Sequence, residues 1–217
     1  MKEPERAALV LCLLAMAAMP GACAAAEARF GKGAWSVGAN GGIAFLAMGD
    51  INDQIRIRNA VELTRFEEIH HGGEWSADVR YGIAKKYFVG IESGGISAVS
   101  HDQAGTRELR VSGTPAVVLG GTTIDLSGAV AVRALAGLGA LLHARFEEPG
   151  AGKVEGTSFL GYLGGEIEIR VAGALGLVGQ GIVRGALLQH PENAPYNVDF
   201  SGGTIRGGVR ATFGGAP

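Results

Sequence analysis

The stretch TIRGGVRATF, residues Thr204 to Phe213, alternates apolar and polar positions over its whole length. The odd-numbered positions, here called the apolar parity, hold Ile205, Val209 and Phe213 with small residues between them. The even-numbered positions hold Arg206 and Arg210. A period of two places successive side chains on opposite faces of a β-strand. The stretch is therefore predicted to be a strand with one apolar and one charged face, and the fold depends on which face meets the surroundings.

The same alternation recurs along the chain, so that eight strands are predicted in all. Glycine is frequent in these segments, with 37 glycines in the chain, and each interior glycine costs a helix about 1 kcal/mol relative to alanine. Helix remains an alternative for the fifth and seventh segments. The predicted strands are 35–45, 74–83, 87–99, 106–119, 129–146, 159–171, 175–188 and 204–213.

The first 26 residues read as a secretory signal peptide that is removed on export. Lys2 and Arg6 precede an apolar run and then small residues, so cleavage is expected after Ala24 or Ala26. A lipoprotein signal ending at Cys23 is the alternative, although the usual large aliphatic residue three positions earlier is missing. Residues 27–217, about 190 in number, suit one domain.

The composition of the exported chain argues against disulfides, nucleic-acid binding and membrane-spanning helices. Both cysteines, Cys12 and Cys23, lie in the segment expected to be removed, so no disulfide is expected. The net charge of −2 gives no basic bias toward nucleic acid. After the signal peptide, no uninterrupted run of 18 apolar residues predicts a membrane helix.

The apolar face of each predicted strand could pack against a protein core or against lipid, because apolar and polar residues alternate along the strand in both cases. Lipid is favoured because this face mixes Val, Ile and Leu with many Gly and Ala, whereas a packed core needs larger side chains. Short connections at 84–86 and 172–174 also alternate with long polar ones, as in outer-membrane barrels. An interfacial girdle is predicted from aromatic residues near strand ends: Trp35, Phe45, Trp75, Tyr87, Phe146, Phe159 and Phe213.

The stretch DFSGGTIRGGVRATF, residues 199–213, resembles the closing strand of small outer-membrane barrels of the OmpW, OmpX and OmpA-barrel type. SFLGYLGGEIEI (158–169) and GQGIVRGALL (179–188) are similar in style to their sixth and seventh strands. The resemblance implies an all-β, transmembrane, antiparallel up-and-down barrel of eight strands in the outer membrane of a Gram-negative cell. It also implies that the barrel-assembly machinery reads Phe213, although the family usually stops on this aromatic and here Gly214 to Pro217 follow.

In such a barrel the charged parity faces the lumen, which in an eight-stranded barrel is only wide enough for side chains. An ion-pair network is therefore predicted there, with a binding site or a narrow proton or ion path as the alternative. The network is predicted to contain Asp78, Arg80, Glu92, Arg133, Glu166, Glu168, Arg184, Arg206 and Arg210. Glu108, Arg110 and Arg170 are expected on the same face, with Leu109, Val111, Val117 and Leu119 of the fourth strand toward lipid.

Other polar clusters predict no chemistry. EEIHHGGE (67–74) could ligate a metal only if the loop turned its carboxylates around the histidines, and a plain polar loop is expected. Ser100, His101 and Asp102 are contiguous, which does not build a catalytic triad. GDINDQIRIRNA (49–60) predicts a short helix at the rim. No catalytic residue, cofactor or metal is expected.

The expected function is a structural or interaction role in the outer membrane, with a lumen filled by side chains. The expected partners are outer-membrane lipid, lipopolysaccharide and the barrel-assembly machinery, with no nucleic acid, and the barrel is expected to be a monomer. The alternatives are a small-solute or hydrophobic-ligand channel of OmpW type, a lipid-A-modifying barrel enzyme, and a soluble periplasmic lipocalin-like barrel. Fold alone does not choose among them.

Overall fold

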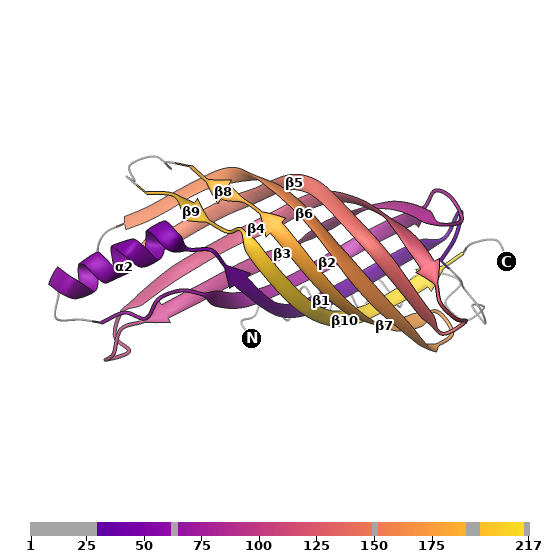
Figure 1. Cartoon of the computed structure of the whole chain (residues 1–217), viewed down its shortest axis with the longest axis horizontal. Helices are drawn as coiled ribbons and strands as arrows, with labels where there is room; N and C mark the ends of the chain where they lie inside the picture. Colours follow the sequence, from indigo (N-terminus) through magenta and orange to yellow (C-terminus); the bar gives the residue numbers. More distant parts are fainter. Residues whose placement is uncertain (1–29, 62–64, 149–151, 190–195, 215–217) are drawn as a thin grey trace.

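The chain forms a closed barrel of eight long strands in the order β1-β10-β7-β6-β5-β4-β3-β2, every neighbouring pair antiparallel (Figure 1). The computed structural model describes residues 30–61, 65–148, 152–189 and 196–214, so the predicted signal peptide lies outside the described residues. The predicted eight-stranded, all-β barrel is confirmed. The elements are β1 (Trp35–Leu46), α2 (Gly49–Val61), β2 (His71–Gly82), β3 (Tyr87–His101), β4 (Glu108–Asp125), β5 (Val130–Glu148), β6 (Gly152–Ala172), β7 (Leu175–Gly185), β8 (Leu187–Leu188), β9 (Val198–Asp199) and β10 (Gly202–Phe213).

The barrel is apolar outside and charged inside. In β7, exposed and buried positions alternate without a break, with Leu177 and Val183 outward and Gln180 and Arg184 inward. Ile205 on β10 is 67% exposed, whereas its neighbour Arg206 is 3% exposed. A soluble sheet has the opposite arrangement, because it buries its apolar face and hydrates its charged one. The outer face therefore suits lipid, and closure leaves no unpaired strand edge in it.

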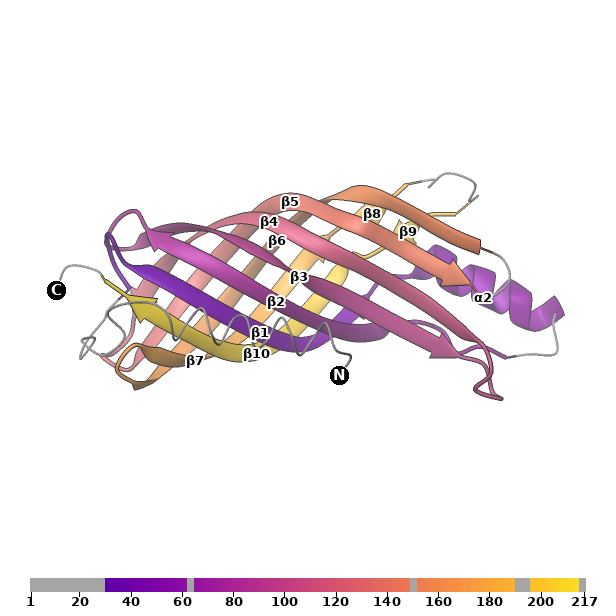
Figure 2. The same cartoon turned by 180° about the vertical axis from the view of Figure 1, so that it is seen from behind.

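The two ends of the barrel differ. One end, here called the turn rim, carries the tight connections after β2, β4 and β6 together with the C-terminal end of β10 (Figure 2). The other end, the loop rim, carries α2 and the longer connections (Figure 1). This asymmetry was predicted, but the connection after the fourth strand is shorter than expected because β4 continues to Asp125. Within the described residues, no helix is long and apolar enough to cross a bilayer.

Strands β4, β5 and β6 have 18, 19 and 21 residues, whereas β1, β2, β7 and β10 have 11 or 12. On the loop-rim half of β4, Leu109 and Val111 face the interior, while Glu108 and Arg110 point outward. The expectation for this strand was therefore wrong, and Val117 and Leu119 also face inward. For Leu109 and Val111, the physical reason is that the loop-rim ends of β4, β5 and β6, here called the β4–β6 extension, reach beyond the shorter strands, and their inner faces pack into an apolar core there, as in a soluble sheet. Val117 lies beside Glu92 and Leu119 beside Gly90 in the register with β3, so these two side chains pack inside the barrel at the level of the charged lumen residues.

A β-bulge in β5 explains a second difference from the sequence-based expectation. The register with β6 shifts between Leu141 and Ala144, and His143 has a positive φ of 49°. Leu142 and His143 consequently both lie on the outside, and the parity reverses beyond them. Phe146 therefore points inward and is 4% exposed, so it does not belong to the predicted aromatic girdle.

Opposite charges alternate on the outer face of the β4–β6 extension. Within strands, the Glu108–Arg110 pair is 2.5 Å and the Arg145–Glu147 pair 3.2 Å apart, and Lys153 pairs with Glu155. Across strands, the register sets Arg145 beside Glu155 and Glu147 beside Lys153. Hydrogen bonds from Lys153 and His143 lower the pKa of Glu155 to about 2. We call these six charged residues the charge ladder, and its Glu155 carboxylate stays ionised throughout the physiological pH range.

Exposed aromatic side chains lie toward both rims of the barrel. The Trp35 and Tyr81 rings contact each other near the turn rim, with centroids 4.8 Å apart and planes tilted by 46°, and the partly exposed Phe213 is opposite Trp35 in the register of β1 and β10. Toward the loop rim, Phe45 and Phe159 are 50% and 70% exposed. Aromatic side chains at these two levels are typical of membrane interfaces.

Candidate functional site

The turn-rim half of the lumen is organised around Glu166 on β6. Its carboxylate accepts hydrogen bonds from Arg80 on β2 at 2.8 Å and Arg133 on β5 at 2.6 Å. It also accepts from Arg210 on β10 and from Gln180 on β7 at 2.5 Å. Side chains from four other strands thus converge on one buried carboxylate across the lumen.

Two further carboxylates complete the charge balance of this cluster. Asp78 lies 2.9 Å from Arg80 and 2.8 Å from Arg210, and Glu168 lies 2.5 Å from Arg133. Two glycines provide room for these long side chains. A Cβ at Gly38 would lie 2.8 Å from Asp78 Oδ1, and one at Gly176 would lie 2.8 Å from Glu168.

A second cluster lies nearer the middle of the barrel. Both Glu92 oxygens accept from Arg206 at 2.8 Å, and Arg206 also reaches Glu74 at 3.1 Å. Glu74 in turn accepts from Arg184 at 2.5 Å and from Thr204 at 2.9 Å. Gln180 joins the two clusters, because its carbonyl oxygen accepts from Arg206 at 2.6 Å while its amide donates to Glu166.

Together the two clusters contain five arginines and five carboxylates, none more than 7% exposed. We call this set the lumen ion layer. A buried charge costs several kcal/mol unless it is paired and hydrogen-bonded, and here every member has an oppositely charged partner. Its members are Glu74, Asp78, Arg80, Glu92, Arg133, Glu166, Glu168, Arg184, Arg206 and Arg210.

All nine residues that the sequence placed in the network lie in this layer, and Glu74 was missed. Glu74 is at a polar position of the predicted strand 74–83, but it was grouped with the adjacent polar stretch 67–74 and not with the lumen residues. Three other charged residues lie elsewhere than expected. Glu108 and Arg110 point outward, and Arg170 stays at the turn rim, 2.9 Å from Asp125.

Two aromatic rings lie beneath the ion layer on the turn-rim side. Phe30 and Phe88 meet edge to face with centroids 5.7 Å apart, and both are buried. The Arg133 guanidinium lies 5.3 Å from the Phe30 ring, and that of Arg80 lies 5.2 Å from the Phe88 ring. These cation–π contacts place an aromatic floor directly against the charged layer.

On the loop-rim side, the ion layer gives way to an apolar core. The inner faces of the β4–β6 extension supply part of it, and α2 adds Ile51 and Ile55. Asn52 fixes the helix, since its side chain bonds the backbone N–H of Ile69 at 2.8 Å and the carbonyl of Ile69 at 3.0 Å. The predicted rim helix is thereby confirmed, and it covers this end of the lumen.

The closed eight-stranded topology, the apolar exterior and the charged interior together decide the fold. This chain has the fold of a small transmembrane-type β-barrel. In this barrel the strands alternate apolar-out and polar-in, as transmembrane barrels do.

The chain is similar in architecture to solved structures of three outer-membrane proteins. Ail, the attachment invasion locus protein of Yersinia pestis, is 11% identical, with a TM-score of 0.49, covering 84% of this chain and 99% of that one. OprG from Pseudomonas aeruginosa is 9% identical, with a TM-score of 0.49, covering 85% and 98%. AlkL is 12% identical, with a TM-score of 0.44, covering 88% and 94%. No protein-family model and no curated protein matches the sequence.

The remaining polar motifs stay at the loop rim of the barrel. Glu68 lies 3.1 Å from Arg56 and 3.3 Å from His70, and the described residues contain no group of three or more metal-ligating side chains. Ser100 donates to the Glu67 carbonyl at 2.5 Å. Asp102 accepts from Thr106, so Ser100 and Asp102 serve different loop contacts.

Proposed function

We propose that this barrel has a structural or interaction role in the outer membrane and does not conduct solutes through its lumen. The observation that carries the proposal is the lumen ion layer, which spans the barrel between the aromatic floor and the apolar core. An eight-stranded barrel is only wide enough for such side chains. A small-solute channel that ran the length of the lumen would need a path through all three layers.

The location and partners belong to the same proposal. The apolar outer face and the two levels of aromatic side chains suit outer-membrane lipid, and the charge ladder lies beyond the lipid-facing zone, where lipopolysaccharide headgroups and water meet the protein. Export by the signal peptide and insertion by the barrel-assembly machinery would place a monomer there. Because the loop rim carries α2 and the charge ladder, we assign contacts with external partners to that end. No enzymatic or nucleic-acid-binding role is proposed.

Conductance tests the filled lumen. Purified barrel reconstituted in a planar bilayer should show no large, stable, porin-like current steps, because the buried side chains of the ion layer occupy the lumen. A wide porin in the same bilayer serves as the positive control. Stable steps comparable with those of the porin would contradict the proposal.

Phe213 is proposed as the aromatic that the assembly machinery reads. Phe213→Ala should lower the amount of folded barrel in the outer-membrane fraction, measured as the band that migrates compactly in a gel unless boiled, without lowering export. Phe159→Ala is the matched control, because Phe159 is another phenylalanine on a barrel strand but lies in the interior of β6 and not at the end of the last strand. Equal folded amounts for the two variants would argue against a special role for Phe213.

A further inference from the structure

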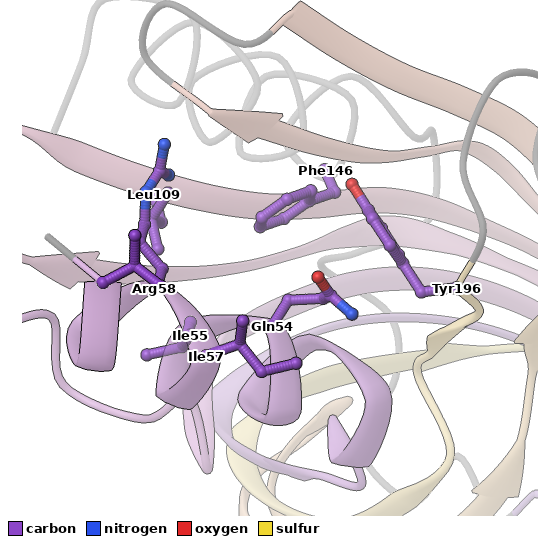
Figure 3. A pocket seen from close by; sticks show the side chains of 8 residues that line it. Gln54, Ile55, Ile57, Arg58, Leu109, Phe146 and Tyr196 are labelled. Atoms are coloured by element: carbon purple, nitrogen blue, oxygen red, sulfur yellow. The ribbon is translucent and has the colours of Figure 1, made fainter.

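The cover that α2 forms over the apolar core has a gap. A pocket of about 300 Å³ lies there between the helix, the loop-rim ends of β4 and β5, and Tyr196, which comes two residues before β9 (Figure 3). The pocket lies at the loop rim, where Ile57 and Val61 of its lining are exposed to solvent. Its lining consists of Gln54, Ile55, Ile57, Arg58, Val61, Leu109, Phe146 and Tyr196.

The floor of the pocket is apolar and belongs to the core. Leu109 and Phe146 are 1% and 4% exposed and are fixed by the β4–β6 extension. Ile57 and Val61, at the mouth, are 59% and 82% exposed. An apolar group seated here would therefore remove exposed apolar surface from water, which favours binding in proportion to the area covered.

Polar groups stand around this apolar floor. Arg58 is the charged residue among the described lining side chains, and its guanidinium is held 5.8 Å from the Phe66 ring. Tyr196 packs edge to face on Phe146, with centroids 6.0 Å apart, and Gln54 extends from α2 toward these two rings (Figure 3). Burial raises the pKa of Tyr196, so its phenol stays a neutral hydrogen-bond donor. An apolar pocket with a few convergent polar groups is the usual form of a small-ligand site.

We propose that this pocket binds a small amphipathic carboxylate, with its apolar body on Leu109 and Phe146 and its carboxylate at Arg58. The volume accommodates on the order of ten groups of water size, since each takes about 30 Å³. A guanidinium is suited to a carboxylate because it presents several N–H donors in one plane. The inference goes beyond the proposed function, because binding at the rim requires no passage through the lumen.

Calorimetric titration of octanoate into the barrel in lipid nanodiscs tests the proposal, with empty nanodiscs as the reference for lipid partitioning. We expect one saturable site per barrel. Arg58→Gln should weaken binding about tenfold or more, because it removes a charge-assisted hydrogen bond. Arg56→Gln is the matched control: it removes the same charge from the same helix at a residue that pairs with Asp53 and Glu68 and does not line the pocket.

Two further measurements separate the parts of the proposal. Ile57→Gln should weaken binding severalfold through the apolar wall, and octanol should bind more weakly than octanoate. The gel in which a folded barrel migrates compactly unless boiled establishes that each variant is folded. Heats equal to those of empty nanodiscs, equal affinities for the Arg58 and Arg56 variants, or octanol binding as tightly as octanoate would each overturn the proposal.

Discussion

Replacing Glu166 with alanine should destabilise the folded barrel by about 3–5 kcal/mol, the cost of leaving buried charges without their partner. Glu166 is 1% exposed and pairs with Arg80, Arg133 and Arg210. Without its carboxylate, three guanidiniums would share Asp78 and Glu168 in a part of the lumen where all these side chains are almost fully buried. The free energy of unfolding by urea, measured in phospholipid vesicles, is the appropriate readout.

Glu147→Ala is the control for this variant. The Glu147 side chain is 37% exposed on the charge ladder and pairs with Arg145 at 3.2 Å. A surface pair of this kind contributes about 0–1 kcal/mol, so little should change. A loss of stability that is the same for Glu166→Ala and Glu147→Ala would show that the ion layer is not a cooperative buried network.

Replacing Ile205 with arginine should cost about 2–4 kcal/mol, the range for a cation at the lipid-facing midplane of a transmembrane barrel. Ile205 is 67% exposed on the outer face of β10, opposite Ile43 of β1. In a water-soluble barrel an exposed isoleucine could be exchanged for arginine at almost no cost. The same unfolding measurement in vesicles therefore distinguishes a lipid-facing surface from a hydrated one.

Thr157→Arg provides the matched comparison, because Thr157 is also exposed on the outer face of a strand but lies in the β4–β6 extension. The change in unfolding free energy should stay within about 0.5 kcal/mol there, as for ordinary surface positions. If the two arginine variants were equally mild, the outer face of β10 would not lie in lipid.

The number of strands and most of their faces could be predicted from the sequence because period-two alternation is a local property. β7 and β10 show this well, since their apolar and polar residues lie on the predicted sides. β4 could not be assigned in this way. Its pattern shows that Leu109 and Val111 share a face, but not whether that part of the strand lies in lipid or beyond it. The bulge that turns Phe146 inward adds one residue to β5 without any sequence signal that stands out.

The members of the ion layer could be predicted because charged residues at alternate positions of a strand, opposite its apolar face, must point into the lumen. Their ion-pair partners could not be predicted, because the closure of the barrel determines which strands face each other across the lumen. Glu166 and Arg80 are 86 residues apart in sequence and meet only when β2 and β6 face each other across the lumen. Glu74 shows the opposite problem, since its neighbours in sequence suggested a loop while its strand places it in the lumen.

The equal number of arginines and carboxylates in the lumen ion layer has an electrical consequence. A voltage across a membrane does work on a structure in proportion to the net charge that it displaces. Five positive and five negative charges, held together in one layer, give no net charge on which such a voltage could act. The interior of this barrel should therefore keep the same packing whether the membrane is polarised or not, unlike a voltage sensor, whose charges are of one sign and must move.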